Sequence, residues 1–253
     1  MKIVILGAGN VATHLAWALK NIGHEISQIF SRTQLSAATL ALQLDTDYCA
    51  SPALLKQADL YIYALSDNAL EAVISEVNIH SGIHIHTAGS VNMNIFEARF
   101  DNFGVFYPLQ TFSKDKDIDF SEVPIFVEGN NKNVTDKLFE LAKSLTNKPF
   151  VATSDQRVRL HIAAVFACNF SNYFYTLASD ILKNESIPFD ILHPLIQETA
   201  SKIQTLTPVD AQTGPARRND TDTMQKHLEM IEDEDLKKIY SDLSERISER
   251  YKK

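Results

Sequence analysis

The residues best suited to chemistry form a glycine-rich run near the N-terminus. The apolar residues 3–6 precede it directly, and an amphipathic stretch, 11–19, follows it. In a G-x-G-x-x-A pattern the first glycine permits a tight turn, the second lets the backbone approach a pyrophosphate, and the small sixth residue lets helix and strand pack closely. The start of the helix then faces the negative charge. The run reads Gly7, Ala8, Gly9, Asn10, Val11 and Ala12.

This run predicts a dinucleotide-binding turn, and its position between an apolar strand and an amphipathic helix strengthens the prediction. Two alternatives remain for the same residues. The turn could only link a strand to a helix, or it could bind S-adenosylmethionine.

The residues after the second predicted strand, 26–30, distinguish between the two common dinucleotides. An NAD site usually has Asp or Glu there, about 20 residues beyond the glycines, against the ribose hydroxyls. This chain has Ser31, Arg32 and Thr33 instead. An Arg between two hydroxyl residues offers hydrogen-bond donors to a 2′-phosphate, which a carboxylate would repel. The sequence therefore favours NADP over NAD; the alternative is that Arg32 is a solvated surface cation.

Two further loops follow predicted strands and would pass the nicotinamide end of the cofactor. Leu65, Ser66 and Asp67 follow the strand at 60–64, and we expect them near the nicotinamide ribose. The alternative for Asp67 is that it caps the helix that begins near Ala69.

The second of these loops, 86–90, follows the strand at 83–86. We expect Thr87 and Gly89 to contact the cofactor and His86 to take part in catalysis, because ligands of open α/β sheets bind outside the strand ends. The alternative is a hydrogen-bonded turn, since Thr, Gly and Ser commonly form turns. His84 shares a strand face with His86, but two imidazoles without a third ligand make a poor zinc site, so no metal is expected.

Polar residues also recur along one helix of the second half. Arg157, His161, Asn169 and Asn172 fall within about a third of the helix circumference, at ~100° per residue. Hydride transfer to C=O or C=N needs a proton donor for the developing anion. We expect His161 to be that donor and Asn169 to orient the substrate. The alternative is that both are satisfied polar groups at a helix or dimer interface.

The segment 213–220 is a loop by composition, with Gly-Pro followed by two arginines. We expect Arg217 or Arg218 to clamp an acidic substrate, with the other meeting Asp220 or solvent. An interdomain salt-bridge loop is the alternative. Asp220 or the next residue can cap the helix that carries His227, which has either a site role or a structural one.

The predicted elements place these residues in two domains. Residues 1–153 alternate short apolar runs with amphipathic stretches, which indicates an α/β domain with a doubly wound, Rossmann-type sheet. Residues 154–253 lack a convincing strand and predict an all-α domain for substrate binding or dimerisation. The remaining predicted strands are 104–107, 125–128, a short one near 150–151 and a possible one at Tyr48.

The amino-acid composition argues against some classes of binding partner. A formal charge of −8 opposes unaided binding to nucleic acid or an anionic membrane, so a small-molecule substrate is the better expectation. No apolar run approaches the ~20 residues of a membrane span, and no cleavable signal is visible. The two cysteines, Cys49 and Cys168, are too few for a disulfide framework, which fits a reducing cytoplasm.

Taken together, these motifs resemble a Rossmann-like, NADP-binding family whose C-terminal half is a domain of unknown function. That family is similar in plan to pyrroline-5-carboxylate reductases, deazaflavin-dependent NADP oxidoreductases and β-hydroxyacid dehydrogenases. The resemblance implies a helical, usually dimer-forming C-terminal domain, and hence a homodimer. The segments that carry it, besides the glycine-rich turn, are 86–90, 108–112 (PLQTF), 161–170 (HIAAVFACNF) and 213–220 followed by His227.

Two residues depart from the pattern of this family. Tyr107 stands where the family usually has His before Pro-Leu-Gln, and Asn219 where it usually has Gly before Asp. Tyr107 keeps a donor but loses a titratable imidazole. Two functions therefore remain: an NADP-dependent oxidoreductase acting on a small, anionic carbonyl or imine compound, or a noncatalytic NADP-binding sensor or assembly protein.

Overall fold

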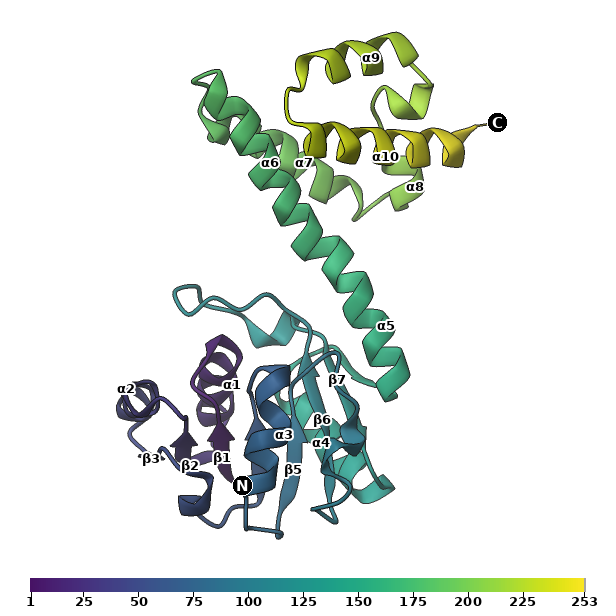
Figure 1. Cartoon of the computed structure of the whole chain (residues 1–253). Coiled ribbons are helices and arrows are strands. Elements are labelled where there is room, and N and C mark those ends of the chain that lie inside the picture. The colour runs from purple at the N-terminus through teal and green to yellow at the C-terminus, as the bar shows by residue number, and fades with distance from the viewer. Residues whose placement is uncertain (253) are drawn as a thin grey trace. The chain divides into compact units, whose positions relative to one another are not determined.

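The chain folds into two compact units, Met1–Ser171 and Asn172–Lys253, in a computed structural model that describes residues 1–252 (Figure 1). The predicted change from mixed structure to helices, at residues 153–154, coincides with the start of helix α5 (Ser154–Ala164). This helix nevertheless belongs to the N-terminal unit, because its first turn is bonded to the sheet through Arg157 and Glu128.

The N-terminal unit is built on one eight-stranded sheet within the described residues, in the order β3-β2-β1-β4-β5-β6-β7-β8. Neighbouring strands from β3 to β6 pair in parallel, β7 runs antiparallel to β6, and β8 is parallel to β7. All the predicted strands are present, including the uncertain one at Tyr48. Their bounds are β1 (Lys2–Leu6), β2 (Glu25–Phe30), β3 (Asp47–Cys49), β4 (Leu60–Tyr63), β5 (Ile83–His86), β6 (Phe103–Pro108), β7 (Ile125–Gly129) and β8 (Pro149–Val151).

Helices cover both faces of this sheet, which explains why β1 is apolar at four successive positions. Ile3 and Ile5 pack on one side with α1 (Asn10–Asn21), α2 (Gln34–Leu44) and α4 (Lys132–Leu145). Val4 and Leu6 pack on the other with α3 (Asp67–Glu76) and the short 3-10 helix η2 (Met93–Phe96). Between β3 and β4 the chain forms only a 3-10 turn, η1 (Pro52–Leu54). This is the doubly wound fold that the sequence predicts.

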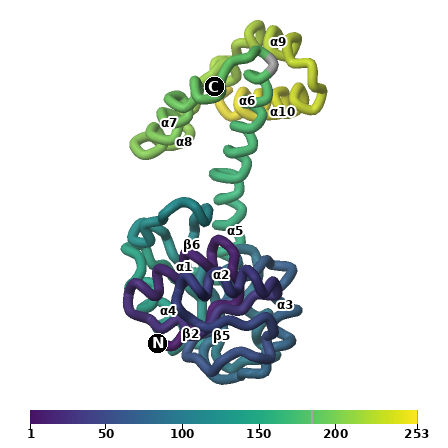
Figure 2. The backbone as a smooth tube through the Cα atoms, turned by 90° about the vertical axis from the view of Figure 1, so that its left-hand side faces the viewer, coloured from purple at the N-terminus to yellow at the C-terminus, as the bar shows by residue number. Residues whose placement is uncertain are grey.

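The rest of the chain is helical, and residues 155–252 contain no strand. A capping box formed by Thr153 and Gln156 starts α5. The helix then continues through a π-helical stretch into α6, as the backbone trace shows (Figure 2). The elements are η4 (Val165–Phe170), α6 (Ser171–Asn184), η5 (Phe189–Leu192), α7 (His193–Lys202), α8 (Pro208–Ala211), η6 (Ala216–Arg218), α9 (Thr221–Met230) and α10 (Glu234–Tyr251).

None of the helices in the part of the chain that the structure describes is both long and apolar enough to cross a membrane.

Candidate functional site

Gly7 ends the first strand at a point where only glycine fits. Its φ is +132°, and a Cβ atom there would overlap the carbonyl oxygen of Ala64, beyond the end of β4. The Gly7 N–H donates to the carbonyl of Phe30, the last residue of β2, at 2.8 Å. The turn is therefore held between the carboxyl ends of two strands, as the sequence predicts for the first glycine of the pattern.

Gly9, in contrast, is not required by the fold. Its φ of −82° is open to any residue, and a Cβ atom would meet nothing within 4 Å, so the fold itself does not require glycine there. Gly9 caps α1 without a side-chain bond, and N–H groups of a first helical turn favour an anion. Ala8 and Ala12 are buried. Backbone and open space are what a pyrophosphate needs, so these residues fit a dinucleotide.

Asn10 fastens this turn to a distant loop. Its side-chain amide donates to the carbonyl oxygen of Phe112 at 2.7 Å. One turn further along α1, the ring Nε2 of His14 lies 2.8 Å from the carbonyl oxygen of Ser113. Val11, between them, is half-buried. The 108–112 motif is thereby tied to the nucleotide helix, a connection that the sequence analysis did not foresee.

The end of β2 carries the predicted 2′-phosphate group contacts. Arg32 is exposed, and among residues 1–252 no hydrogen bond or ion pair joins its guanidinium to another group. The Thr33 N–H donates to the Ser31 hydroxyl at 3.3 Å. Thr33 is the N-cap residue of α2, yet its side chain makes no capping bond. The guanidinium and the Thr33 hydroxyl are therefore available to a ligand at this strand end.

Asp67 joins the loops that follow β4 and β5. It is the first residue of α3, whose N-cap is Ser66, and the Ser90 hydroxyl donates to the Asp67 carboxylate. Asp67 is therefore not the helix cap that the sequence analysis offered as an alternative. Leu65 is half-buried against the apolar core beneath the loop. The bond between the two loops leaves Ser66 and Asp67 exposed at the carboxyl edge of the sheet.

His86 lies inside the protein. Its side chain is 0% exposed, and its Nδ1 accepts a hydrogen bond from the Ala88 N–H at 3.2 Å. Burial lowers the pKa of His86 to about 3, and the charge of Arg157 adds to this effect, so the ring is neutral. Thr87 is buried and its N–H donates to the carbonyl of Tyr63. For these two residues the geometry is that of the hydrogen-bonded turn; catalysis by His86 stays a prediction.

Gly89 brings this loop against two polar rings. A Cβ atom on Gly89 would lie 2.6 Å from Nδ1 of His161 and 2.9 Å from Cζ of Tyr107. The hydroxyl of Tyr107 and Nδ1 of His161 are themselves 3.1 Å apart, which is hydrogen-bond distance. Glycine is therefore required here for close packing. The residue that departs from the family pattern, Tyr107, is the direct partner of the predicted proton donor.

A buried ion pair fixes the root of the helix that carries His161. Arg157 is 1% exposed, and its guanidinium donates to the Glu128 carboxylate of β7 at 2.6 Å. The same guanidinium donates to the carbonyl of Val91, in the loop after β5. Glu128 also accepts from the N–H and hydroxyl of Ser154 at 2.8 and 2.7 Å. Sequence reasoning placed Arg157 on the stripe but missed Glu128, because nothing in a single sequence pairs those two positions.

Asn169 lies in the π-helical stretch and is exposed. A π turn changes the number of residues per turn, so the stripe drawn at ~100° per residue does not continue unchanged beyond His161. Such turns occur often at functional sites. Apolar periodicity offers no signal for them.

The predicted loop of the C-terminal unit is held by its own partners. Arg217 donates to the carbonyls of Gln212 and Asp210, and its guanidinium lies 5.2 Å from the ring centroid of Tyr251. Arg218 lies 3.9 Å from the carboxylate of Asp220, which caps α9 as expected. A substrate clamp by Arg217 stays a prediction.

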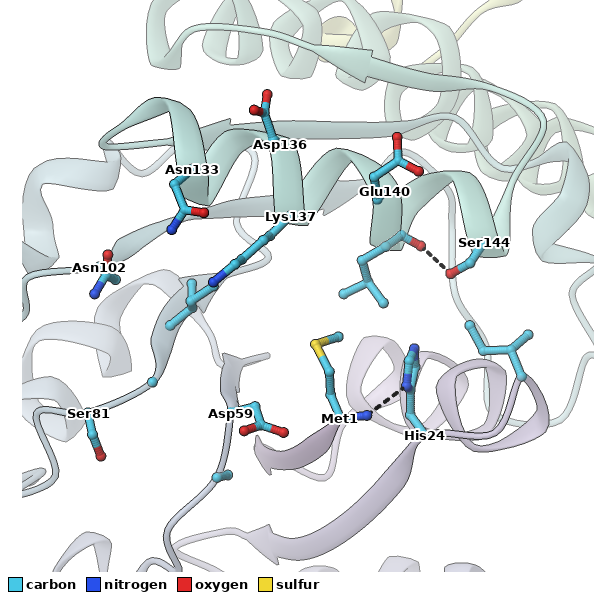
Figure 3. A pocket seen from close by; sticks show the side chains of 15 residues that line it. Met1, His24, Asp59, Ser81, Asn102, Asn133, Asp136, Lys137, Glu140 and Ser144 are labelled. Carbon is cyan, nitrogen blue, oxygen red and sulfur yellow. Dashed lines mark hydrogen bonds between the residues drawn. The ribbon is translucent and has the colours of Figure 1, made fainter.

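The opposite, amino-terminal end of the sheet carries a cavity of about 1060 Å³ (Figure 3). The amine of Met1 lies 3.3 Å from Nδ1 of His24 at its wall, and Asp59 and Lys137 also line it. It contains none of the predicted site residues. The predicted cofactor-binding residues instead follow the carboxyl ends of β1, β2, β4 and β5, the usual ligand edge of such a sheet.

A glycine turn of this form, on a doubly wound sheet that is followed by helices, defines a dinucleotide-binding Rossmann protein with a helical C-terminal domain. Comparison with protein families agrees. The family described as "NADP oxidoreductase coenzyme F420-dependent" matches residues 2–86, and "Domain of unknown function (DUF2520)" matches residues 123–247. Among curated proteins, no significant match is found.

One solved structure shares much of the sequence. The "putative NADP oxidoreductase BF3122 from Bacteroides fragilis" is 42% identical, with a TM-score of 0.91 over 98% of each chain. The chain therefore belongs to the family of Rossmann-type NADP oxidoreductases that carry a DUF2520 domain after the nucleotide-binding domain.

Two more distant structures share the fold. The 1-pyrroline-5-carboxylate reductase from Streptococcus pyogenes is 17% identical, with a TM-score of 0.67 over 99% of this chain and 98% of its own. The reductive aminase from Aspergillus terreus, in complex with NADPH and ethyl-5-oxohexanoate, is 18% identical, with a TM-score of 0.69 over 98% and 94%.

Proposed function

We propose that this protein is an NADP-dependent oxidoreductase that reduces a small carbonyl or imine compound by hydride transfer. The observation that carries the proposal is the open space at Gly9, at the start of α1, on the same sheet edge as the Tyr107–His161 pair. A bound dinucleotide would run from that turn along the edge, as ligands of such sheets do. The reduced nicotinamide supplies the hydride.

The preference for NADP rests on Arg32. Its guanidinium is exposed and has no internal partner among residues 1–252, and the end of β2 offers no carboxylate to a ribose. A free guanidinium can donate two hydrogen bonds to a phosphate group. This supports a 2′-phosphate contact over the ribose contact of an NAD site.

Hydride addition leaves an anion on oxygen or nitrogen that must be protonated. His161 is our candidate for supplying that proton, either itself or through the Tyr107 hydroxyl that lies at hydrogen-bond distance from its Nδ1, and Asn169 is our candidate for orienting the substrate. His161 is half-buried beside Gly89, whereas Asn169 is exposed in η4. The anionic character of the substrate rests on the arginine loop, where Arg217 has internal partners.

We also propose that the protein is a homodimer through its helical half. Of the residues of the C-terminal unit whose burial is described, only Ala216 and Ser248 are buried. A soluble chain rarely leaves so many large apolar side chains in water without a partner. The exposed side chains along α5, η4 and α6 include Ile162 (53%), Phe166 (65%), Phe170 (44%), Tyr173 (53%) and Ile181 (48%).

Its expected compartment is the cytoplasm. Cys49 and Cys168 are both free thiols, as a reducing environment maintains them. The substrate would then be a small metabolite of that compartment.

The proposal is tested by following NADPH oxidation with a panel of 2-oxo acids, aldehydes and cyclic imines. We expect turnover with at least one class, and His161→Ala should lower kcat by about 100-fold, the usual contribution of a positioned acid. NADPH binding without turnover, and no effect of His161→Ala on any activity, would instead support the noncatalytic sensor or assembly protein.

A further inference from the structure

Polar side chains from β5, β6, β7 and α5 lie on one face of the sheet, and they extend toward the carboxyl ends of the strands, where ligands bind. His86 of β5 pairs with Val105 of β6, and Val105 pairs with Glu128 of β7. Paired residues of neighbouring strands point to the same face of a sheet. Tyr107 is two residues beyond Val105, so it occupies the next position on this face, toward the carboxyl end of β6.

Two residues of α5 contact these strand residues in the same order, toward the carboxyl ends of the strands. Arg157 binds Glu128, and His161, one helical turn later, reaches Tyr107. The ion pair therefore sets the position of α5, and that position brings the imidazole to the phenol. Tyr107 reaches the sheet edge from the strand side and His161 from the helix side.

Burial and a nearby charge act on the Tyr107 phenol in opposite directions. Desolvation raises the pKa of Tyr107, so its hydroxyl keeps the proton at neutral pH, while the charge of Arg157 acts in the opposite direction and stabilises the phenolate. Of the titratable side chains on this face of the sheet, Arg157 and Glu128 form an ion pair, and His86 is neutral. Arg157 is thus the nearest buried cation, and it is partly neutralised by Glu128.

We propose that Tyr107 is the catalytic residue that protonates the reduced substrate, and that His161 positions its hydroxyl and returns the proton to it. This inference rests on the proposed function. It assigns the last proton transfer to a strand residue, with the helix residue behind it.

Hydride addition to the C=O or C=N carbon moves the π electrons onto oxygen or nitrogen. That atom takes the proton from the Tyr107 hydroxyl and leaves a phenolate beside Nδ1 of His161. The phenolate then takes the proton that His161 carries on Nδ1, while Nε2 of the same ring takes a proton from a solvent water molecule, which leaves as hydroxide.

The test compares Tyr107→Phe with Tyr107→His, using 1-pyrroline-5-carboxylate and ethyl 5-oxohexanoate with an amine as probes, compounds that the names of two structural neighbours contain. We expect Tyr107→Phe to bind NADPH within about twofold of wild type, by fluorescence titration, while kcat falls by about 100-fold. Tyr107→His should restore part of the rate only at low pH, because an imidazole loses its proton as pH rises through about 6.5. The wild-type phenol keeps its proton above that pH.

A matched control removes another tyrosine–histidine hydrogen bond. Tyr240 of α10 and Nδ1 of His227 are 2.8 Å apart, with a similar edge-on ring arrangement. Tyr240→Phe should leave the NADPH oxidation rate and its pH profile unchanged. Full activity of Tyr107→Phe, or the wild-type pH profile in Tyr107→His, would overturn the proposal.

A second measurement does not depend on turnover. In protein labelled with 15N-histidine, the Nδ1 resonance of His161, assigned with His161→Asn, should move in Tyr107→Phe and stay in place in Tyr240→Phe. If wild type reduces no probe, the proposed function fails, and the resonance still decides whether the pair exists. A His161 signal that ignores Tyr107→Phe would overturn the pair itself.

Discussion

Gly7 and Gly9 stand two residues apart and are glycines for different reasons. Gly7 is required by the chain, since its backbone conformation and the carbonyl of Ala64 leave no room for a side chain. Gly9 meets nothing, so its missing side chain serves a molecule outside the chain. Spacing alone predicted both, because the pattern encodes a ligand contact as well as a turn.

Arg32 gives the residue-scale prediction. Arg32→Ala should weaken NADPH binding by about tenfold or more, the equivalent of one charge-assisted hydrogen bond of about 1.5 kcal/mol, and leave NADH binding nearly unchanged. Calorimetric titration of both cofactors measures this. Lys56→Ala, which removes another exposed cation of the same unit, is the control. Equal losses for NADPH and NADH would show that no 2′-phosphate contact exists.

Other site residues could not be assigned from type and spacing. His86 was expected at the site because it ends a strand, yet it is buried there by the residues around it. Glu128 was not expected at all, since its role depends on a strand register and on the helix that crosses it. The sequence shows which side chains could take part in chemistry, but the burial of His86 and the pairing of Glu128 with Arg157 depend on how the chain packs.

At the scale of elements, the Glu128–Arg157 pair joins β7, α5 and the loop after β5. Glu128→Gln should lower the free energy of unfolding of the N-terminal unit by about 3 kcal/mol, because it leaves a buried guanidinium without its counter-charge. Urea unfolding followed by the fluorescence of Trp17, the single tryptophan, measures the change. Asp136→Asn breaks the exposed pair with Lys132 and should cost less than about 1 kcal/mol. Similar costs for both variants would contradict the role given to the buried pair.

The strand β5 makes the fold sensitive to acid. Burial lowers the pKa of His84 to about 4 and that of His86 to about 3, below the ordinary 6.5. Below pH 6.5 the unfolded chain therefore binds more protons than the folded one, and stability falls as the pH drops. Each ring steepens the fall by up to about 1.4 kcal/mol per pH unit until its folded pKa is reached.

His84→Phe tests this acid sensitivity, because His84 is stacked between Tyr61 and Phe100 and another ring can replace it there. The variant should unfold in urea with a shallower dependence on pH between about 6.5 and 4 than wild type. An unchanged slope would show that His84 titrates normally in the folded protein.

Strands and long helices were predictable because their apolar periodicity is local. The antiparallel direction of β7 was not predicted, since that depends on how the chain returns to the sheet. The π-helical stretch η4 was missed because one less tightly wound segment leaves the apolar composition unchanged.

At the scale of the whole molecule, the pattern of apolar residues along the chain predicted two domains. The boundary between the two compact units follows Ser171, whereas the sequence pattern changes from mixed strands and helices to helices alone at residues 153–154. The two positions differ because a buried ion pair keeps α5 with the sheet. The sparse core of the C-terminal unit supports an association that a single chain does not show.

The homodimer gives the prediction at this scale. Wild type should elute with twice the mass of one chain in size-exclusion chromatography with light scattering. Phe166→Glu, in the exposed apolar stretch, should shift the protein toward the monomer, because a charge would be buried in the interface. Leu42→Glu alters a highly exposed apolar residue of α2 and should remain dimeric. A monomeric wild type would end the dimer proposal.

We propose above that the carboxyl edge of the sheet binds NADPH and that the reduction takes place there. A crystal structure of the protein with NADPH tests it most directly. We expect the pyrophosphate over Gly9 at the start of α1, the 2′-phosphate against Arg32, and the nicotinamide beside Gly89 and the Tyr107 hydroxyl. NADPH bound at the amino-terminal cavity of Figure 3, or a nicotinamide remote from Tyr107, would contradict it.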